Sequence, residues 1–233
     1  MKIGDDLTGM GCLNKLTCDF FEGLKFGERE RFMIFPILNL HDFNIIHGCM
    51  KEIRFHGRGG QGTVLASVIL VKAFTKEKKY SSAIPYFGFE RRGAPVTAFL
   101  RFDDSPLREK TQIYSPDCVM VMDPALKRSP EIYLGLKEGG ILILSTRKSV
   151  EELDPPPTIG KLGCVDAISI SLEILGSPIT NSCMLGAFVA TTGWLKLDSV
   201  LESIKETWPG EMGEKNLRAA EAGYQKTKVF ELK

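Results

Sequence analysis

A glycine-rich segment, Gly57-Arg58-Gly59-Gly60-Gln61-Gly62, constrains the fold more than any other part of this sequence. It follows a short strand expected at residues 52–56 and precedes a helix expected at residues 63–74. The helix is apolar on nearly every face, which is typical of a helix buried against a sheet. A strand, a tight glycine turn and a buried helix are the opening unit of an α/β domain.

The rest of the chain from residue 50 continues the α/β pattern. Residues 94–102 alternate as a strand does, and the apolar runs at 118–122 and 140–145 are typical of buried, parallel-type strands. A further strand is expected at 162–165, and helices at 130–137, 185–194, 197–207 with Asp198 as its cap, and 214–226. We therefore predict, for residues 50–233, a Rossmann-like three-layer α/β domain with a mostly parallel sheet and helices on both faces.

Residues 1–49 differ from this domain because they show no sustained period of 2 or 3.6. We interpret them as an N-terminal extension of uncertain role, or as the product of an over-long gene start. In the helix expected at 185–194, Gly186 and Ala190 are four residues apart, which would let a neighbouring backbone approach closely on that face.

The glycine segment has the spacing G-x-G-x-x-G, which supports three interpretations. In the first, Gly57, Gly59 and Gly62 hold the pyrophosphate of a dinucleotide at the helix N-terminus. That site needs an acidic residue about 20 positions later for the ribose, and Glu77 and Glu90 are poorly placed. In the second, the glycines serve packing and a subunit contact. In the third, the loop contacts a phosphate-bearing or acyl-carrying substrate shared with a partner chain.

Charge and cysteine content exclude several classes of function. A net charge of +1 gives no global field for a nucleic acid or an anionic membrane, and no segment has the apolar length of a membrane-spanning helix. The six cysteines include no C-x-x-C pair, which argues against an iron–sulfur cluster or another metal site. We expect Cys118, Cys164 and Cys183 to be buried thiols of a reduced, cytoplasmic protein.

A second loop, residues 84–96, combines aromatic residues, glycines and the pair Arg91 and Arg92 just before a strand. This composition is typical of a recognition surface. The alternative is that the two arginines are solvated or pair with Glu90.

Together the two loops resemble a known family. The strings IRFHGRGGQGTVLAS, YFGFERRGAPVTAFLRF and SPDCVMVMDPAL, and the later Asn181-Ser-Cys-Met-Leu-Gly-Ala, are similar to the gamma subunit of pyruvate and related 2-oxoacid:ferredoxin oxidoreductases. The resemblance runs from Met50 to the C-terminus and leaves out residues 1–49.

The resemblance implies a subunit of an enzyme that oxidatively decarboxylates a 2-oxoacid to an acyl-CoA and passes electrons to ferredoxin. It places thiamine diphosphate and the iron–sulfur clusters on alpha, beta and delta-type partners, with coenzyme A as a substrate and no cofactor or catalytic residue on this chain. The chain would then be mainly structural and inactive alone. Pyruvate is favoured over 2-oxoisovalerate, 2-oxoglutarate and aryl 2-oxoacids, since Arg91-Arg92-Gly93-Ala94-Pro95-Val96 is similar to the pyruvate and ketoisovalerate group.

The resemblance also suggests contacts of this chain with coenzyme A or with a partner subunit, through the glycine loop and through Arg58, Arg91, Arg92 and Asn181. His56 is expected to cap or pack beside the glycine loop. Two alternatives from other classes stay open: a stand-alone nicotinamide-dependent oxidoreductase, and an interaction scaffold unrelated to 2-oxoacids.

Overall fold

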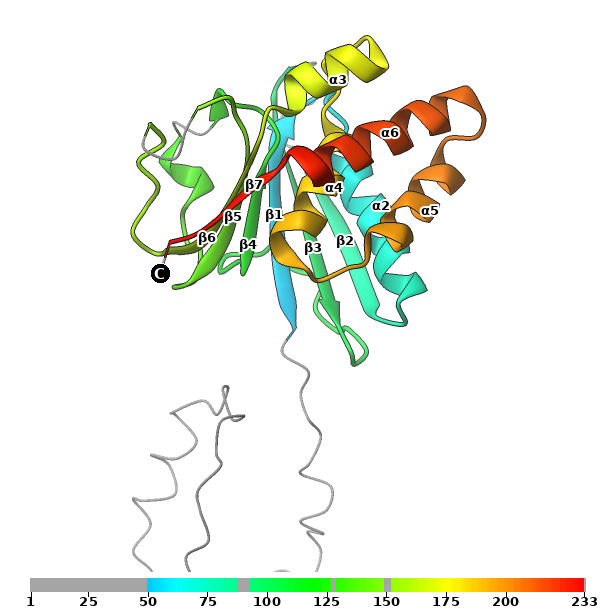
Figure 1. The fold of residues 1–233 in the computed structure, drawn as a ribbon. Helices are drawn as coiled ribbons and strands as arrows, with labels where there is room; N and C mark the ends of the chain where they lie inside the picture. The colour runs from blue at the N-terminus through cyan, green and yellow to red at the C-terminus, as the bar shows by residue number, and fades with distance from the viewer. Residues whose placement is uncertain (1–49, 88–92, 127–128, 149–151, 233) are drawn as a thin grey trace, which may run out of the picture. The chain divides into compact units, whose positions relative to one another are not determined.

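The computed structural model describes residues 50–87, 93–126, 129–148 and 152–232. In these residues seven strands form one sheet in the order β2-β3-β1-β4-β5-β6-β7 (Figure 1). The strands are β1 (Lys51–Arg58), β2 (Tyr80–Phe87), β3 (Pro95–Asp103), β4 (Cys118–Val121), β5 (Gly140–Ser145), β6 (Ile159–Val165) and β7 (Lys228–Glu231). The predicted α/β class is confirmed.

The sheet is parallel in its centre and antiparallel at both sides. Strands β1, β4, β5 and β6 run parallel to one another, whereas β3 is antiparallel to β1, β2 to β3, and β7 to β6. The expectation of a mostly parallel sheet therefore holds for the four central strands. Residues 88–94 join β2 to β3 and are too few for the crossover that parallel neighbours need, so β2 and β3 pair as a hairpin.

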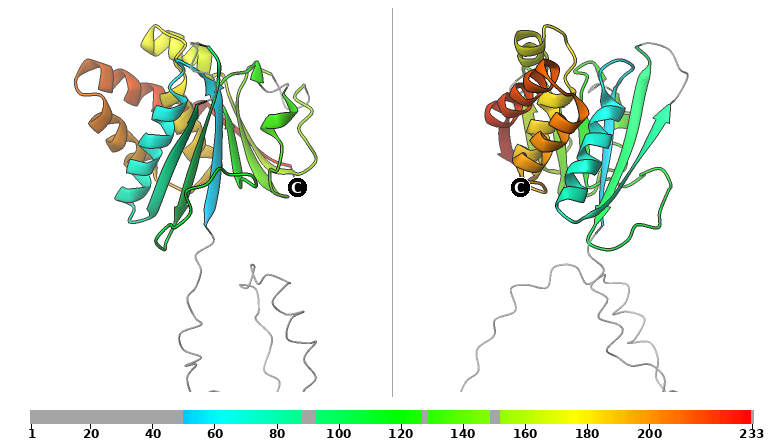
Figure 2. Two further views of the ribbon diagram at one scale, coloured as in Figure 1. Left: turned by 180° about the vertical axis from the view of Figure 1, so that it is seen from behind. Right: turned by 90° about the vertical axis from the view of Figure 1, so that its right-hand side faces the viewer.

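Five α-helices of the described residues lie on one side of the sheet, as the right-hand view of Figure 2 shows. They are α2 (Thr63–Lys76), α3 (Ala167–Leu175), α4 (Asn181–Thr192), α5 (Leu197–Thr207) and α6 (Glu211–Lys226). Their main core contains Phe55, Phe74 and Phe188, all fully buried. The ring of Phe74 stacks on Phe102 of β3 with the ring centroids 3.9 Å apart, which fixes α2 on the antiparallel side of the sheet.

The second face of the sheet is covered by loops and by the 3-10 helix η2 (Pro130–Ile132) over a smaller core. The helical layer expected here over residues 130–137 is reduced to this single turn. A backbone angle and the hydrogen bonds of one arginine explain the difference. Gly135 adopts a φ of +76°, and the carbonyls of Ile132 and Leu134 accept hydrogen bonds from Arg54. The backbone carbonyls of this segment therefore accept hydrogen bonds from the Arg54 side chain and not from the amides of a continuing helix.

The close approach predicted for Gly186 is confirmed. A Cβ on Gly186 would lie 1.9 Å from the carbonyl oxygen of Ala220, and one on Gly223 would lie 2.0 Å from that of Cys183. Helices α4 and α6 therefore touch backbone to backbone. The expected cap at Asp198 is wrong: α5 begins after Lys196, whose own side chain makes no capping hydrogen bond, and Asp198 lies in the first turn.

Candidate functional site

The glycine loop closes the carboxyl end of β1 as a compact turn. The amide of Gln61 donates to the carbonyl of Arg58 at 3.1 Å, and the side-chain oxygen of Gln61 accepts from the Arg58 amide at 2.8 Å. Gly60 and Gly62 have φ values of +95° and +78°, in the left-handed region that glycine adopts without steric cost. The loop conformation is thus dictated by its own sequence.

Two of its glycines are required for packing. A Cβ on Gly57 would lie 2.0 Å from the hydroxyl of Thr63, and one on Gly62 would lie 2.4 Å from the side-chain nitrogen of Asn181. A Cβ on Gly60, in contrast, would have no other atom within 4 Å. The space beside Gly62 is therefore filled by Asn181, which is 1% exposed at the start of α4.

Arg58 is held by its own chain. Its Nε donates to Asp123 Oδ2 at 2.7 Å, and its Nη1 donates to the carbonyl of Gly93 at 3.1 Å. Gln61 donates to the same carboxylate oxygen at 3.3 Å. Asp123 follows β4, and its other oxygen accepts from the Ala125 amide at 2.8 Å. The carboxylate thus fixes the glycine loop to the neighbouring strand end.

The glycine loop lies beside Gly93 and Ala94, the described end of the second loop. The amide of Gly59 donates to the carbonyl of Ala94 at 2.9 Å, and the amide of Gly93 donates to the carbonyl of Gly59 at 3.4 Å. These bonds continue the β1–β3 ladder, in which Gly57 pairs with Val96. Arg91, Arg92 and Glu90 lie outside the described residues.

The N-termini of α2 and α4 meet behind the glycine loop, where Gly62 contacts Asn181. No side chain caps α2, and the Asn181 oxygen accepts from the Ser182 amide at 2.8 Å. The hydroxyls of Thr63 and Thr180 are buried here without a hydrogen-bond partner. The two hydroxyls lie inside the junction, out of reach of a ligand, so the junction is a site of tight packing between the two helix ends.

His56 directly precedes the glycine loop, and its side chain pairs with the buried Arg54, a contact that was not predicted from the sequence. Its Nε2 accepts from Arg54 Nε at 3.0 Å, and burial together with the Arg54 charge lowers the pKa of His56 to about 4. The pKa of Arg54 is itself lowered by burial. A neutral imidazole that serves as an acceptor orders the loops and leaves no free base at this position.

Arg101 of β3 plays the same part further along this face. Its Nε pairs with Glu52 at 2.9 Å, and its guanidinium donates to the carbonyls of Thr111 and Gln112 at 2.6 and 3.2 Å. Arg54 and Arg101 therefore tie the loops of the second face to the sheet. The sequence did carry a signal for these two arginines. Each is a charged residue within a strand, on the face that points away from the helices.

The geometry argues against a nicotinamide site. In a dinucleotide fold the strand after the first helix lies next to β1 and carries the ribose carboxylate. Here that strand is β2, which is separated from β1 by β3. Glu77 accepts from the Lys196 amide at 2.7 Å and from Ser199 at 2.8 Å, so it serves the start of α5.

The predicted buried thiols are confirmed for Cys118, Cys164 and Cys183. Burial raises the pKa of Cys183 to about 12 and that of Cys118 further. Within the part of the chain that the structure describes, no group of three or more His, Cys, Asp or Glu side chains could hold a metal ion, so these residues do not fit an iron–sulfur cluster. No helix there is long and apolar enough to cross a membrane.

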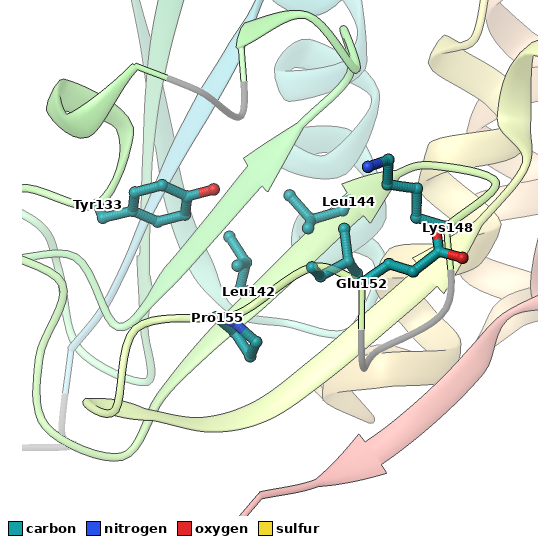
Figure 3. Close-up of a pocket in the computed structure, with 7 residues that line it drawn as sticks. Tyr133, Leu142, Leu144, Lys148, Glu152 and Pro155 are labelled. Carbon is teal, nitrogen blue, oxygen red and sulfur yellow. The ribbon is translucent and has the colours of Figure 1, made fainter.

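A cavity of about 200 Å³ lies on the second face of the sheet (Figure 3). Lys148 and Glu152 stand at one end of it, and Tyr133, Leu142 and Pro155 at the other. Its walls are both polar and aliphatic, and burial raises the pKa of Tyr133. The cavity contains none of the residues expected to form the site.

Comparison with known proteins agrees with this arrangement. The model of the family "Pyruvate ferredoxin/flavodoxin oxidoreductase" matches residues 52–226. The pyruvate/ketoisovalerate oxidoreductases common subunit gamma of Thermococcus kodakarensis is 58% identical over 187 residues, which are 78% of this chain and 100% of that protein. The pyruvate synthase subunit PorC of Methanothermobacter marburgensis is 49% identical, over 77% of this chain and 98% of that protein.

A solved structure shows the same fold. The crystal structure of the pyruvate oxidoreductase subunit PORC from Thermotoga maritima superposes with a TM-score of 0.70 at 38% identity, covering 78% of this chain and 99% of that chain. The predicted α/β fold is confirmed by this likeness. The chain therefore belongs to the pyruvate ferredoxin/flavodoxin oxidoreductase family, within its gamma-subunit group.

Proposed function

We propose that this chain is the gamma subunit of a pyruvate:ferredoxin oxidoreductase, which converts pyruvate and coenzyme A to acetyl-CoA and carbon dioxide and passes the released electrons to ferredoxin. The observation that carries the proposal is the junction of the two motif loops at the carboxyl end of β1, held by Arg58 and Asp123. The relatives that support it are named as a pyruvate/ketoisovalerate oxidoreductases common subunit gamma, matched over 100% of its length, and a pyruvate synthase subunit PorC, matched over 98%.

The chain's part in such an enzyme is structural. Thiamine diphosphate and the iron–sulfur clusters would be carried by alpha, beta and delta-type partners in the cytoplasm. This assignment is supported by the chemistry of the described residues, where His56 is neutral and hydrogen-bonded and the thiols are buried with raised pKa values. Such groups supply neither an activated nucleophile nor a base.

The glycine loop and its surroundings would form the contact with coenzyme A or with a partner subunit. The fixed conformation of the loop supports this, because hydrogen bonds among Arg58, Gln61 and Asp123 hold it in one arrangement. Arg58 would act by positioning the loop, since Asp123 already neutralises its charge. Arg91 and Arg92, which belong to the adjoining loop, would make the outer contacts.

Affinity purification of the chain from its native host under anaerobic conditions tests the proposal. We expect thiamine- and cluster-bearing subunits to copurify, with dye reduction that requires pyruvate and coenzyme A. Parallel assays with 2-oxoisovalerate, 2-oxoglutarate and aryl 2-oxoacids identify the substrate. Activity with one of these in place of pyruvate would correct the substrate, and purification of the chain alone would refute the subunit role.

The contact assignment has its own test. Replacing Arg91 and Arg92 together with Ala should raise the KM for coenzyme A or release a partner from the complex. Arg108→Ala with Arg218→Ala is the matched control, because both arginines are exposed elsewhere on the chain. Kinetics and complex mass equal to those of the control would remove both roles.

A further inference from the structure

Helix α3 has an inner side that its own chain covers. Ala167 and Ile170 are buried, and Ile174 packs against the main core, where the helix meets α4 and α6. Ser171 lies on the same side, because residues three and four apart share one face of a helix, and it is fully buried. The inner side of α3 therefore includes a polar residue.

The outer side of α3 is apolar. Leu172 is 47% exposed and Ile168 and Leu175 are partly exposed, and these three side chains belong to neither apolar core of the described residues. Ile179, which is 39% exposed, continues the series just beyond the end of the helix. Successive members are four, three and four positions apart, which places the three helical ones on one face. We call these four residues the α3 stripe.

An outer side without charge is unlike that of the neighbouring helix α5. The exposed residues of α5 are all charged, namely Asp198, Glu202, Lys205 and Glu206. In α3 the only charged residue is Glu173. A helix that is apolar all round is typically buried on all sides, and apolar residues that are exposed together, and not singly, mark an interaction surface. The α3 stripe is therefore suited to being covered by another molecule.

The α3 stripe lies at the same end of the sheet as the glycine loop. Figures 1 and 2 show α3 at the end where β1 finishes and the glycine loop begins. Ile179 is two positions before Asn181, whose side chain contacts Gly62. A protein that binds against the glycine loop can therefore reach the α3 stripe as well.

We propose that the α3 stripe is buried by an apolar surface of another subunit of the oxidoreductase, as an extension of the contact at the glycine loop. This inference rests on the proposed function, which supplies the partner subunits. Apolar contact surfaces of this kind are typical of permanent complexes. A second copy of this chain suits the surface less well, because a two-fold axis at the stripe would bring the two glycine loops towards each other and close them to other partners.

Charge reversal of the surface character in the native complex tests the proposal. Leu172→Lys with Ile179→Lys should reduce the partner subunit recovered per chain by at least about tenfold, because a lysine buried in an apolar contact loses its hydration. Met212→Lys with Tyr224→Lys is the matched control, since it adds the same charge in place of α6 residues that are 56% and 42% exposed. Native mass spectrometry measures recovery, and the isolated variants should unfold thermally as the wild-type chain does.

Hydrogen exchange of the wild-type chain gives a second measurement that needs no variant. The amides of residues 167–180 should exchange more slowly in the complex than in the isolated chain. The amides of α5, whose exposed residues are charged, should exchange at equal rates in both and serve as the internal reference. Equal exchange of residues 167–180 in the two states would refute burial of the stripe.

The outcomes separate this inference from the proposed function. If the wild-type chain recovers partners and activity while the stripe variant retains as much partner as the control, the stripe is not in the interface and the subunit role stands. If the wild-type chain recovers no partner, the proposed function fails and this inference fails with it. A dimer of the isolated chain that only the stripe variant converts to a monomer would assign the stripe to a second copy instead.

Discussion

Gly62→Ala is the substitution for which the structure gives the most defined cost. The φ of +78° places an L-residue in the left-handed region, at about 1 to 2 kcal/mol. The new Cβ would also lie 2.4 Å from Nδ2 and 2.9 Å from Cγ of Asn181, which is buried between two helix ends and has little room to move. Overpacking of this kind costs about 1 to 3 kcal/mol, so we expect the free energy of unfolding to fall by about 2 to 5 kcal/mol.

Gly60→Ala is the matched control, because its φ of +95° carries the backbone cost while no atom lies within 4 Å of its Cβ position. Urea unfolding of the full chain, followed by circular dichroism, should therefore show a loss of about 1 to 2 kcal/mol for this variant. Adding Asn181→Ala to Gly62→Ala should recover about 1 kcal/mol or more relative to the sum of the single changes. Equal losses for Gly60→Ala and Gly62→Ala would refute the assigned contact with Asn181.

The remaining predictions concern the polar and thiol groups. Because the pKa of His56 is about 4 in the folded chain against 6.5 in the unfolded one, the unfolded chain binds more protons between these values. The free energy of unfolding should then fall by up to about 3 kcal/mol as the pH drops from 6.5 to 4, and a His56→Gln variant with the same slope would contradict this. Asp123→Ala should cost about 1 to 3 kcal/mol by leaving Arg58 unpaired, and should speed hydrogen exchange of the Gly59 amide, whereas protection equal to wild type would count against the carboxylate as the link between the loops. The raised pKa values of Cys118 and Cys183 predict no alkylation by iodoacetamide at pH 8 until the chain is unfolded, which peptide mass spectrometry can check.

Much of the fold could be predicted because its local signals agree with its packing. The apolar run at residues 140–145 and the amphipathic helix at 197–207 have the bounds expected from the sequence. β7 was not predicted, since Lys228–Glu231 is short and largely exposed, and it forms because α6 ends beside the free edge of β6. A strand that forms by pairing with a free neighbouring edge has little strand signal in its own sequence.

The parts of the site that could not be predicted depend on contacts between distant residues. The sequence shows that the glycines of the first loop are needed, but not that Asn181 fills the space beside Gly62 from 119 positions away. The sequence shows arginines within strands. It does not show that Arg54 donates hydrogen bonds to the carbonyls of Ile132 and Leu134, which prevents a helix in that segment. Both effects belong to the tertiary structure, where local propensity is overridden.

The carboxyl ends of β1, β4, β5 and β6 lie along one edge of the sheet because these strands are parallel. At β1 and β4 the chain satisfies its own charges, since Asp123 neutralises Arg58 and holds the glycine loop closed. At β5 and β6 the same edge leaves Lys226 and Lys228 without carboxylate partners among the described residues, around an open crevice. The end of this edge at the glycine loop is therefore rigid and internally paired, which suits it to a fixed contact with a partner subunit.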